Sequence, residues 1–141
     1  MRPPVLPQHG DEDGPGLVDL VVFGAHLSGQ PLNDDLRGRG ATLVGPVQTS
    51  TAYRLWALDT SPPKPGLLRV RSGGAAVRGE HWRLPVAAFG AFVATLPAPM
   101  TIGSVELEDG RVLPGFLVEP FAVEGVRDIT AYGGWVAYLE A

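Results

Sequence analysis

Apolar residues along this chain occur in short runs that end at glycine or proline. The run Leu20–Phe23 is continuous and rich in β-branched residues, which predicts a strand buried on both faces. Residues 102–107 and 112–118 flank the turn Glu108-Asp109-Gly110 and predict a hairpin. Further strands are predicted over residues 41–47, 52–58, 67–71 and 75–84.

Helical patterns are fewer. Asn33 is a suitable N-cap for a short helix towards Arg39. After Pro85, an apolar stripe from Ala87 to Leu96 predicts a second helix, and residues 129–139 predict a third, interrupted by two glycines. The proline-rich stretch 61–66 is expected to be a stiff loop. This order predicts an α+β fold, with a mixed, mostly antiparallel sheet curled into a small β-barrel with flanking helices.

Composition supports one folded domain. Of 141 residues, 19 are Gly and 14 are Pro, but 45% are hydrophobic and the net charge is only −4, so disorder of the whole chain is not expected. Residues 1–17 concentrate Pro, Gly and acidic residues and predict a flexible leader. The single domain is expected over residues 18–141.

Charge and composition also limit the partners. Eleven Lys and Arg against fifteen Asp and Glu disfavour nucleic acid as the main ligand. Ten of the eleven cations are Arg, which either suits small acidic ligands or reflects codon usage; Lys64 is the exception. No apolar run is long enough to span a bilayer and no secretory signal begins the chain, so we expect a cytoplasmic protein with no membrane partner.

The loop from Phe23 to Asn33 is the first candidate site. It joins a buried strand to a helix N-terminus, its glycines allow close approach of a ligand, and His26 titrates near neutral pH. The same pattern also fits an ordinary strand-to-helix connection with a packed histidine.

Two further candidates lie later in the chain. Glu80 shares a strand face with Trp82, which suits a base with a raised pKa, a carboxylate at a barrel rim, or a carboxylate paired with an Arg. Tyr132 precedes Gly133-Gly134, where the two glycines favour either close packing or a loop that contacts a ligand.

Several chemistries find no support in the sequence. There is no G-x-S-x-G elbow, no P-loop and no dinucleotide-binding glycine motif. The chain has no cysteine, and its three histidines lack metal-ligand spacing. We therefore expect neither a metal nor a cofactor.

A series of segments, in order from about Val21 to Leu139, resembles the C-terminal domain of allophanate hydrolase. These segments are GAHLSGQPLNDDL, YRLWAL, KPGLLRV, GEHWRLP, FGAFVATLPAPMTIGSVELEDGR, GFLVEP and DITAYGGWVAYL. The resemblance implies a gamma-glutamyl cyclotransferase-like fold in which the loop from Gly24 to Leu27 lines the ligand cavity. The helix-forming stretch 89–97 holds no acidic residue, whereas cyclotransferases use a glutamate base there, so cyclotransferase activity is not expected.

The resemblance also implies a reaction. In allophanate hydrolase an amidase half, absent here, produces N-carboxycarbamate, and the C-terminal half is thought to decarboxylate it. His26 matches the loop histidine that is the family's candidate for this chemistry, because a protonated histidine can deliver a proton as the C–N bond breaks. We expect a small anionic substrate, with contacts from Gly24, Ala25, Leu27, Gln30, Asn33, Glu80 and Tyr132.

Three functions remain open at this point. We favour a lyase-type enzyme of urea and nitrogen metabolism with no amidase activity of its own. The alternatives are a non-catalytic accessory or split subunit of an amidase, and a small-anion-binding protein that keeps the cavity without the chemistry. The strand edges would also allow a homodimer.

Overall fold

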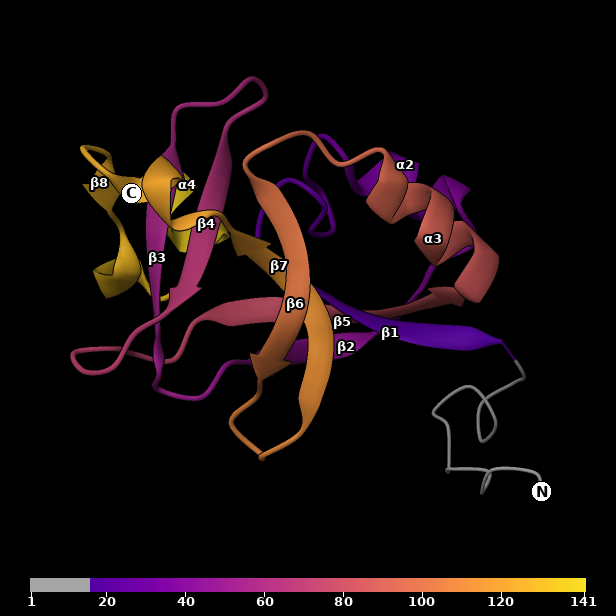
Figure 1. The fold of residues 1–141 in the computed structure, drawn as a ribbon, viewed down its shortest axis with the longest axis horizontal. Coiled ribbons are helices and arrows are strands. Elements are labelled where there is room, and N and C mark those ends of the chain that lie inside the picture. The colour runs from indigo at the N-terminus through magenta and orange to yellow at the C-terminus, as the bar shows by residue number, and fades with distance from the viewer. Residues whose placement is uncertain (1–15) are drawn as a thin grey trace.

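The structure is a computed structural model that describes residues 16–141, and its strands form two sheets (Figure 1). All but the last two residues of the predicted leader, residues 1–17, lie outside this described part. The larger sheet has five strands in the order β2-β5-β1-β7-β6, and the smaller has three in the order β4-β3-β8.

The five-stranded sheet is built around β1. Its strands are β1 (Leu17–Val22), β2 (Thr42–Gln48), β5 (Arg78–Pro85), β6 (Met100–Glu106) and β7 (Val112–Val118). β1 pairs antiparallel with β5 along its whole length and parallel with β7 at Val21. The apolar run Leu20–Val22 of this central strand is fully buried in the core, as its continuous hydrophobicity predicted.

The smaller sheet consists of β3 (Tyr53–Leu58), β4 (Lys64–Arg69) and the two-residue strand β8 (Arg127–Asp128). β4 begins at Lys64, three residues before the predicted start, so the expectation that residues 64–66 belong to a loop is wrong. Pro65 is tolerated there because β4 is an edge strand whose only partner is β3, so a missing N–H costs no ladder bond on the outer side.

The helices lie at the two ends of the molecule. In Figure 1, α2 (Asn33–Gly38) and α3 (Val86–Ala94) lie together on one side, and α4 (Trp135–Leu139) lies beside the three-stranded sheet on the other. Short 3-10 turns span Pro120–Val123 and Thr130–Tyr132. The predicted helix over 129–139 is thus divided in two, because Gly133 adopts a positive φ of 79° that ends the first turn.

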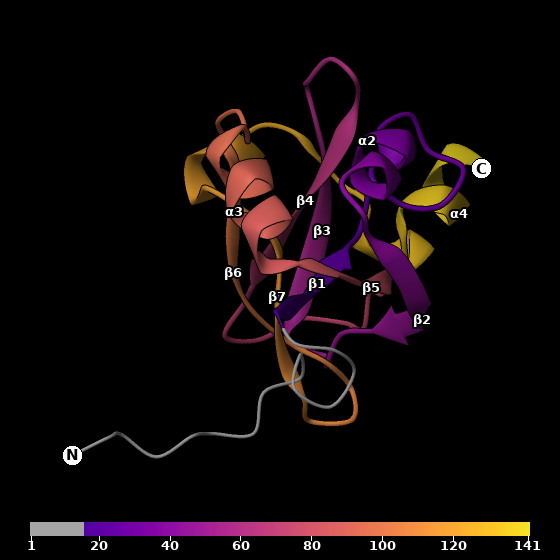
Figure 2. The same ribbon diagram turned by 90° about the vertical axis from the view of Figure 1, so that its right-hand side faces the viewer.

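The predicted fold class is confirmed, and the sheet pairings are antiparallel except for β1 with β7. The predicted hairpin pairs β6 with β7 from Met100 opposite Val118 to Glu106 opposite Val112. The strands do not close into the expected barrel. They separate into two sheets that flank a common core, with α2 and α3 against the larger one (Figure 2).

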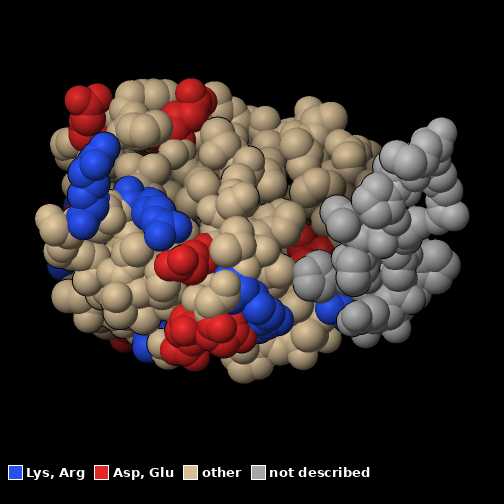
Figure 3. Space-filling view, turned by 60° about the horizontal axis from the view of Figure 1, so that its bottom comes forward, with Lys and Arg blue, Asp and Glu red and all other residues tan. Residues whose placement is uncertain are grey.

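The surface carries charges of both signs. On the face shown in Figure 3, acidic and basic side chains are interspersed and do not form a broad patch of one sign. None of the helices within residues 16–141 is long and apolar enough to cross a membrane.

Candidate functional site

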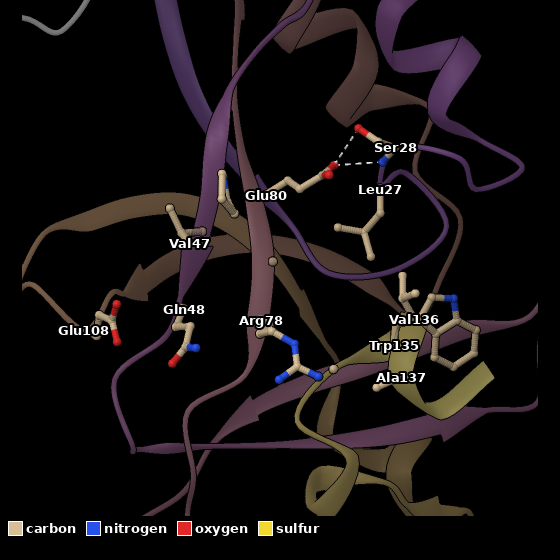
Figure 4. A pocket seen from close by; sticks show the side chains of 13 residues that line it. Leu27, Ser28, Val47, Gln48, Arg78, Glu80, Glu108, Trp135, Val136 and Ala137 are labelled. Carbon is tan, nitrogen blue, oxygen red and sulfur yellow. Dashed lines mark hydrogen bonds between the residues drawn. The ribbon is translucent and has the colours of Figure 1, made fainter. Parts of the chain in front are cut away.

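Two cavities lie on either side of the loop that follows β1. The larger has a volume of about 410 Å³ and includes Leu27 and Ser28 in its wall (Figure 4). The smaller has a volume of about 20 Å³ and includes Gly24, Ala25 and His26. The loop predicted as a site therefore contributes successive residues to two different cavities.

The loop is held in a compact shape by its own backbone. Leu27 N–H donates to the Gly24 carbonyl at 3.0 Å, and Leu32 N–H donates to the Ala25 carbonyl at 2.8 Å. Gly24 packs on the start of β4, since a Cβ added to it would lie 2.6 Å from Cγ of Pro65 and closer still to Cδ. This position therefore needs glycine for close approach.

Asn33 was predicted to cap α2 with its side chain, and this prediction is wrong. The N-cap position is Leu32, and no side chain caps the helix. The Asn33 carboxamide instead donates to the His26 carbonyl at 2.9 Å and accepts from Nε of Arg37 at 2.7 Å. Asn33 is buried and fixes the backbone of His26, so it supports the loop without lining either cavity.

The His26 side chain is enclosed by aromatic rings. It stacks on Phe116, with ring centroids 5.0 Å apart, and meets the edge of Phe92 at 5.2 Å. Burial, helped by the nearby positive charge of Lys64, lowers the pKa of the imidazole from 6.5 to about 4. His26 is therefore uncharged at neutral pH in the unliganded site.

Lys64 is the cation of the small cavity. The residue is only 9% exposed, and within residues 16–141 no carboxylate pairs with it. Its ammonium is not sealed in the interior, so it is available to an anionic ligand in the cavity. The stretch that contains Lys64 was predicted to be a stiff loop and no role was assigned to it, although Lys64 is the only lysine in the chain, which could have marked it.

Glu80 faces the larger cavity from the middle of β5. Its Oε1 accepts hydrogen bonds from Ser28 N–H (2.8 Å), Ser28 Oγ (3.2 Å) and the Trp82 indole (3.2 Å). Glu80 and Trp82 do share one strand face, as the alternation predicted. No Arg in the described chain pairs with Glu80, so the alternative of a paired carboxylate is not what the structure shows.

Arg78 lines the same cavity two residues before Glu80, and the sequence analysis did not assign it a role. Its backbone N–H donates to the Gly133 carbonyl at 2.9 Å and its guanidinium donates to the Tyr132 carbonyl at 3.2 Å. Gly133 has a positive φ of 79°, which favours glycine, and a Cβ there would lie 2.9 Å from the mobile guanidinium. The Gly-Gly pair thus packs closely against Arg78.

Two expected contact residues lie away from both cavities. Gln30 is half-buried in the loop and lines neither cavity, and the same is true of Tyr132. The Tyr132 hydroxyl accepts from Arg127 at 2.9 Å, and its ring packs against Tyr138. Among residues 16–141, no three His, Asp or Glu side chains gather closely enough to hold a metal ion.

The comparisons with known proteins converge on one family. The model of the allophanate hydrolase C-terminal domain matches residues 18–140. The chain is 43% identical over 135 residues to urea amidolyase of Saccharomyces cerevisiae, covering 92% of this chain and 7% of that protein. It therefore spans less than a tenth of the curated relatives that it matches.

Solved structures agree in sequence and in shape. The allophanate hydrolase of Kluyveromyces lactis is 42% identical with a TM-score of 0.86, over 92% of this chain and 22% of that one. A uropathogenic E. coli-specific protein is 36% identical with a TM-score of 0.82, over 88% of this chain and 96% of that one. A gamma-glutamyl cyclotransferase, 12% identical with a TM-score of 0.55, shares the fold alone.

Proposed function

Since the chain belongs to the allophanate hydrolase C-terminal domain family, we propose that it decarboxylates N-carboxycarbamate, or a closely related N-carboxylated amide, at the small cavity between His26 and Lys64. The observation that supports this site most strongly is Lys64, a largely buried residue whose ammonium has no carboxylate partner in the described chain and acts electrostatically on His26. A cation and a proton carrier are the two groups that this reaction needs.

The distribution of charge favours the small cavity over the large one. N-carboxycarbamate carries two carboxylates, and Lys64 is the only ionised group in the wall of the small cavity when His26 is neutral. The wall of the large cavity holds Arg78 together with the carboxylates of Glu80 and Glu108. A dianion is therefore attracted to the first site and meets a net negative charge at the second.

The chemistry follows from the bond that breaks. When CO2 leaves, the electron pair of the C–N bond stays on the nitrogen, which takes up a proton to give carbamate. His26 supplies that proton, because an approaching dianion opposes the effects of burial and of Lys64 and raises the pKa of the imidazole. Lys64 binds the carboxylate that remains.

The size of the cavity sets how the substrate enters. A volume of about 20 Å³ is enough for roughly one water molecule, so the substrate can enter only when lining side chains move. The lining residues are buried except for Leu96 and Met100, which are half-exposed and form the solvent side of the cavity. Displacement of these two flexible side chains would admit the substrate.

A coupled assay tests the proposal. A separate amidase converts allophanate to N-carboxycarbamate, and release of CO2 is followed with and without this chain. We expect the wild-type chain to accelerate release, and His26→Ala or Lys64→Met to lower kcat/KM by about 100-fold or more, as loss of a proton donor or charge clamp does. Thermal unfolding of each variant serves as the control for folding.

The proposal also concerns where the substrate comes from. The related urea amidolyases and allophanate hydrolases are much longer chains that contain this domain. We therefore expect an amidase, in the same chain or a separate one, to supply the substrate. If CO2 release with the wild-type chain equals release in buffer, the domain acts as a non-catalytic partner instead.

A further inference from the structure

We propose that the larger cavity is a second binding site, for a small zwitterion of the α-amino acid class with an apolar side chain. Its ammonium group would bind Glu80 and its carboxylate would bind Arg78. This site is separate from the one around His26 and Lys64, so it can fail while the proposed decarboxylase function stands, and the reverse also holds.

The larger cavity has the size and character of a small-molecule site. Its volume of about 410 Å³ lies in the range of roughly 300–1,000 Å³ in which small-molecule sites fall. Apolar groups form much of the wall, among them Leu27, Val47, Trp135 and Val136. In Figure 4, Leu27, Trp135 and Val136 lie together on one side of Glu80 and Arg78, where an aliphatic side chain would find contact, and Val47 lies on the other side.

The Glu80 carboxylate has one oxygen available to a ligand. All three of its donors converge on Oε1, and Oε2 accepts no hydrogen bond within the described chain. Oε2 is not sealed in the interior either, so it remains available to a ligand in the cavity. A carboxylate held rigidly by three donors is a preorganised acceptor for an ammonium group.

Arg78 places a positive charge in the wall of the same cavity. It shares a strand face with Glu80 because the two are two residues apart on β5, yet their side chains diverge (Figure 4). Glu80 reaches towards Ser28, while Arg78 reaches towards Gly133, and no ion pair joins them within 4.0 Å. A guanidinium that spends one N–H on the Tyr132 carbonyl keeps others for a bidentate carboxylate contact.

The opposite charges of Glu80 and Arg78 favour a ligand that carries both an ammonium group and a carboxylate. An amine alone would leave Arg78 unpaired, and a carboxylate alone would leave Glu80 unpaired. A ureido acid could donate N–H bonds to Glu80 and a carboxylate to Arg78, but it is a net anion, and Glu108 at the same cavity disfavours added negative charge. A zwitterion satisfies both groups without changing the charge.

Tryptophan side chains provide a direct readout. The Trp82 indole N–H donates to the same Glu80 oxygen, and Trp135 lines the cavity, whereas Trp56 lies on β3 outside it. In 1H–15N spectra of the full chain titrated with L-leucine, we expect saturable shifts of the Trp82 and Trp135 indole signals and no shift of Trp56. Isoamylamine and 4-methylpentanoate, which carry one charge each, should bind at least about tenfold more weakly.

Variants separate the site from folding. Arg78→Met and Glu80→Gln should each weaken leucine binding by about tenfold or more, while Glu108→Gln, in the same wall, should not weaken it. Val136 lies on α4, lines the cavity and is itself exposed, so Val136→Trp should fill the cavity without altering either charge. Glu80→Gln could also loosen the loop at Ser28, which bonds to Glu80. If the Glu80→Gln protein does not fold, the binding measured with Arg78→Met decides the test.

Three results would overturn the proposal. The first is that leucine causes no saturable shift. The second is that the single-charge compounds bind as tightly as leucine, and the third is that allophanate binds more tightly than leucine, which would assign the cavity to a ureido acid. None of these results affects CO2 release at His26.

Discussion

At the scale of single residues, the two side chains of the proposed site, His26 and Lys64, are polar groups in a largely buried environment. His26 sits between two phenylalanine rings, with Lys64 close enough to lower its pKa further. Both residues are buried, and both face a cavity. A histidine in a glycine-containing loop could be selected from the sequence, and Lys64 stands out as the only lysine. That the two share a site could not be predicted, because 38 positions separate them and their segments meet through tertiary packing such as that of Gly24 on Pro65.

Burial of His26 predicts a pH-dependent stability. The folded-state pKa of about 4 lies below the unfolded value of 6.5, so the unfolded chain binds a proton first as the pH falls. Its contribution is therefore complete above pH 6.5 and is lost between 6.5 and 4. Relative to His26→Gln, the wild-type free energy of unfolding should fall by about 2–3 kcal/mol between pH 7.5 and 4.5.

Urea unfolding at the two pH values measures this difference. Subtracting the variant removes the titration of the carboxylates, which both proteins share. Parallel losses in wild type and His26→Gln would mean that the imidazole is as free to protonate in the folded chain as in the unfolded one.

Gly24 gives a second prediction at this scale. Gly24→Ala forces a methyl group against the Pro65 ring, so we expect a loss of about 1–3 kcal/mol in stability, as overpacking of a close contact causes. Gly90→Ala is the matched control, because its added methyl meets nothing within 4 Å and lies in α3, where Ala should stabilise by about 0.5–1 kcal/mol. Equal effects of the two changes on Tm would contradict the close packing of Gly24.

At the scale of elements, patterns of hydrophobicity predicted the strands well where a strand is buried on both faces or belongs to a hairpin. β1 and the β6–β7 pair were found this way. β4 was missed at its start, because three prolines and a glycine at 62–66 carry a strong turn signal. Proline is acceptable in this strand because the outer edge of β4 is unpaired. Lys64, the cation of the proposed site, lies in the stretch whose strand was not predicted.

Attachment of the C-terminal segment to β3 gives a prediction at this scale. Thr130 Oγ accepts from the Leu55 N–H at 2.8 Å, and Thr130 is buried. Thr130→Val keeps the shape but leaves that buried N–H without a partner, so we expect a loss of about 1–3 kcal/mol. Thr42→Val removes only a long, exposed bond to the Arg83 carbonyl and should change stability by less than about 0.5 kcal/mol.

The pair of variants is compared by thermal or urea unfolding. A Thr130→Val protein as stable as the Thr42→Val protein would show that the Leu55 N–H finds another partner.

At the scale of the whole molecule, alternation and turn signals were sufficient for the fold class but not for its closure. Short strands between glycines suggested one barrel, whereas the strands divide into sheets of five and three around a shared core. Closure depends on pairing between strands far apart in the chain, which local patterns do not encode. The division leaves two separate cavities on either side of one loop, so a single predicted site became two.

The central claim is that this domain accelerates loss of CO2 from N-carboxycarbamate through Lys64 and His26. The most direct measurement is the first-order rate of disappearance of 13C-labelled N-carboxycarbamate, formed in place by an amidase, with the wild-type chain, with Lys64→Met and with buffer alone. The account predicts a rate that rises in proportion to wild-type concentration and returns to the buffer rate with Lys64→Met of unchanged Tm. A wild-type rate equal to the buffer rate, or a fully active Lys64→Met chain, would contradict it.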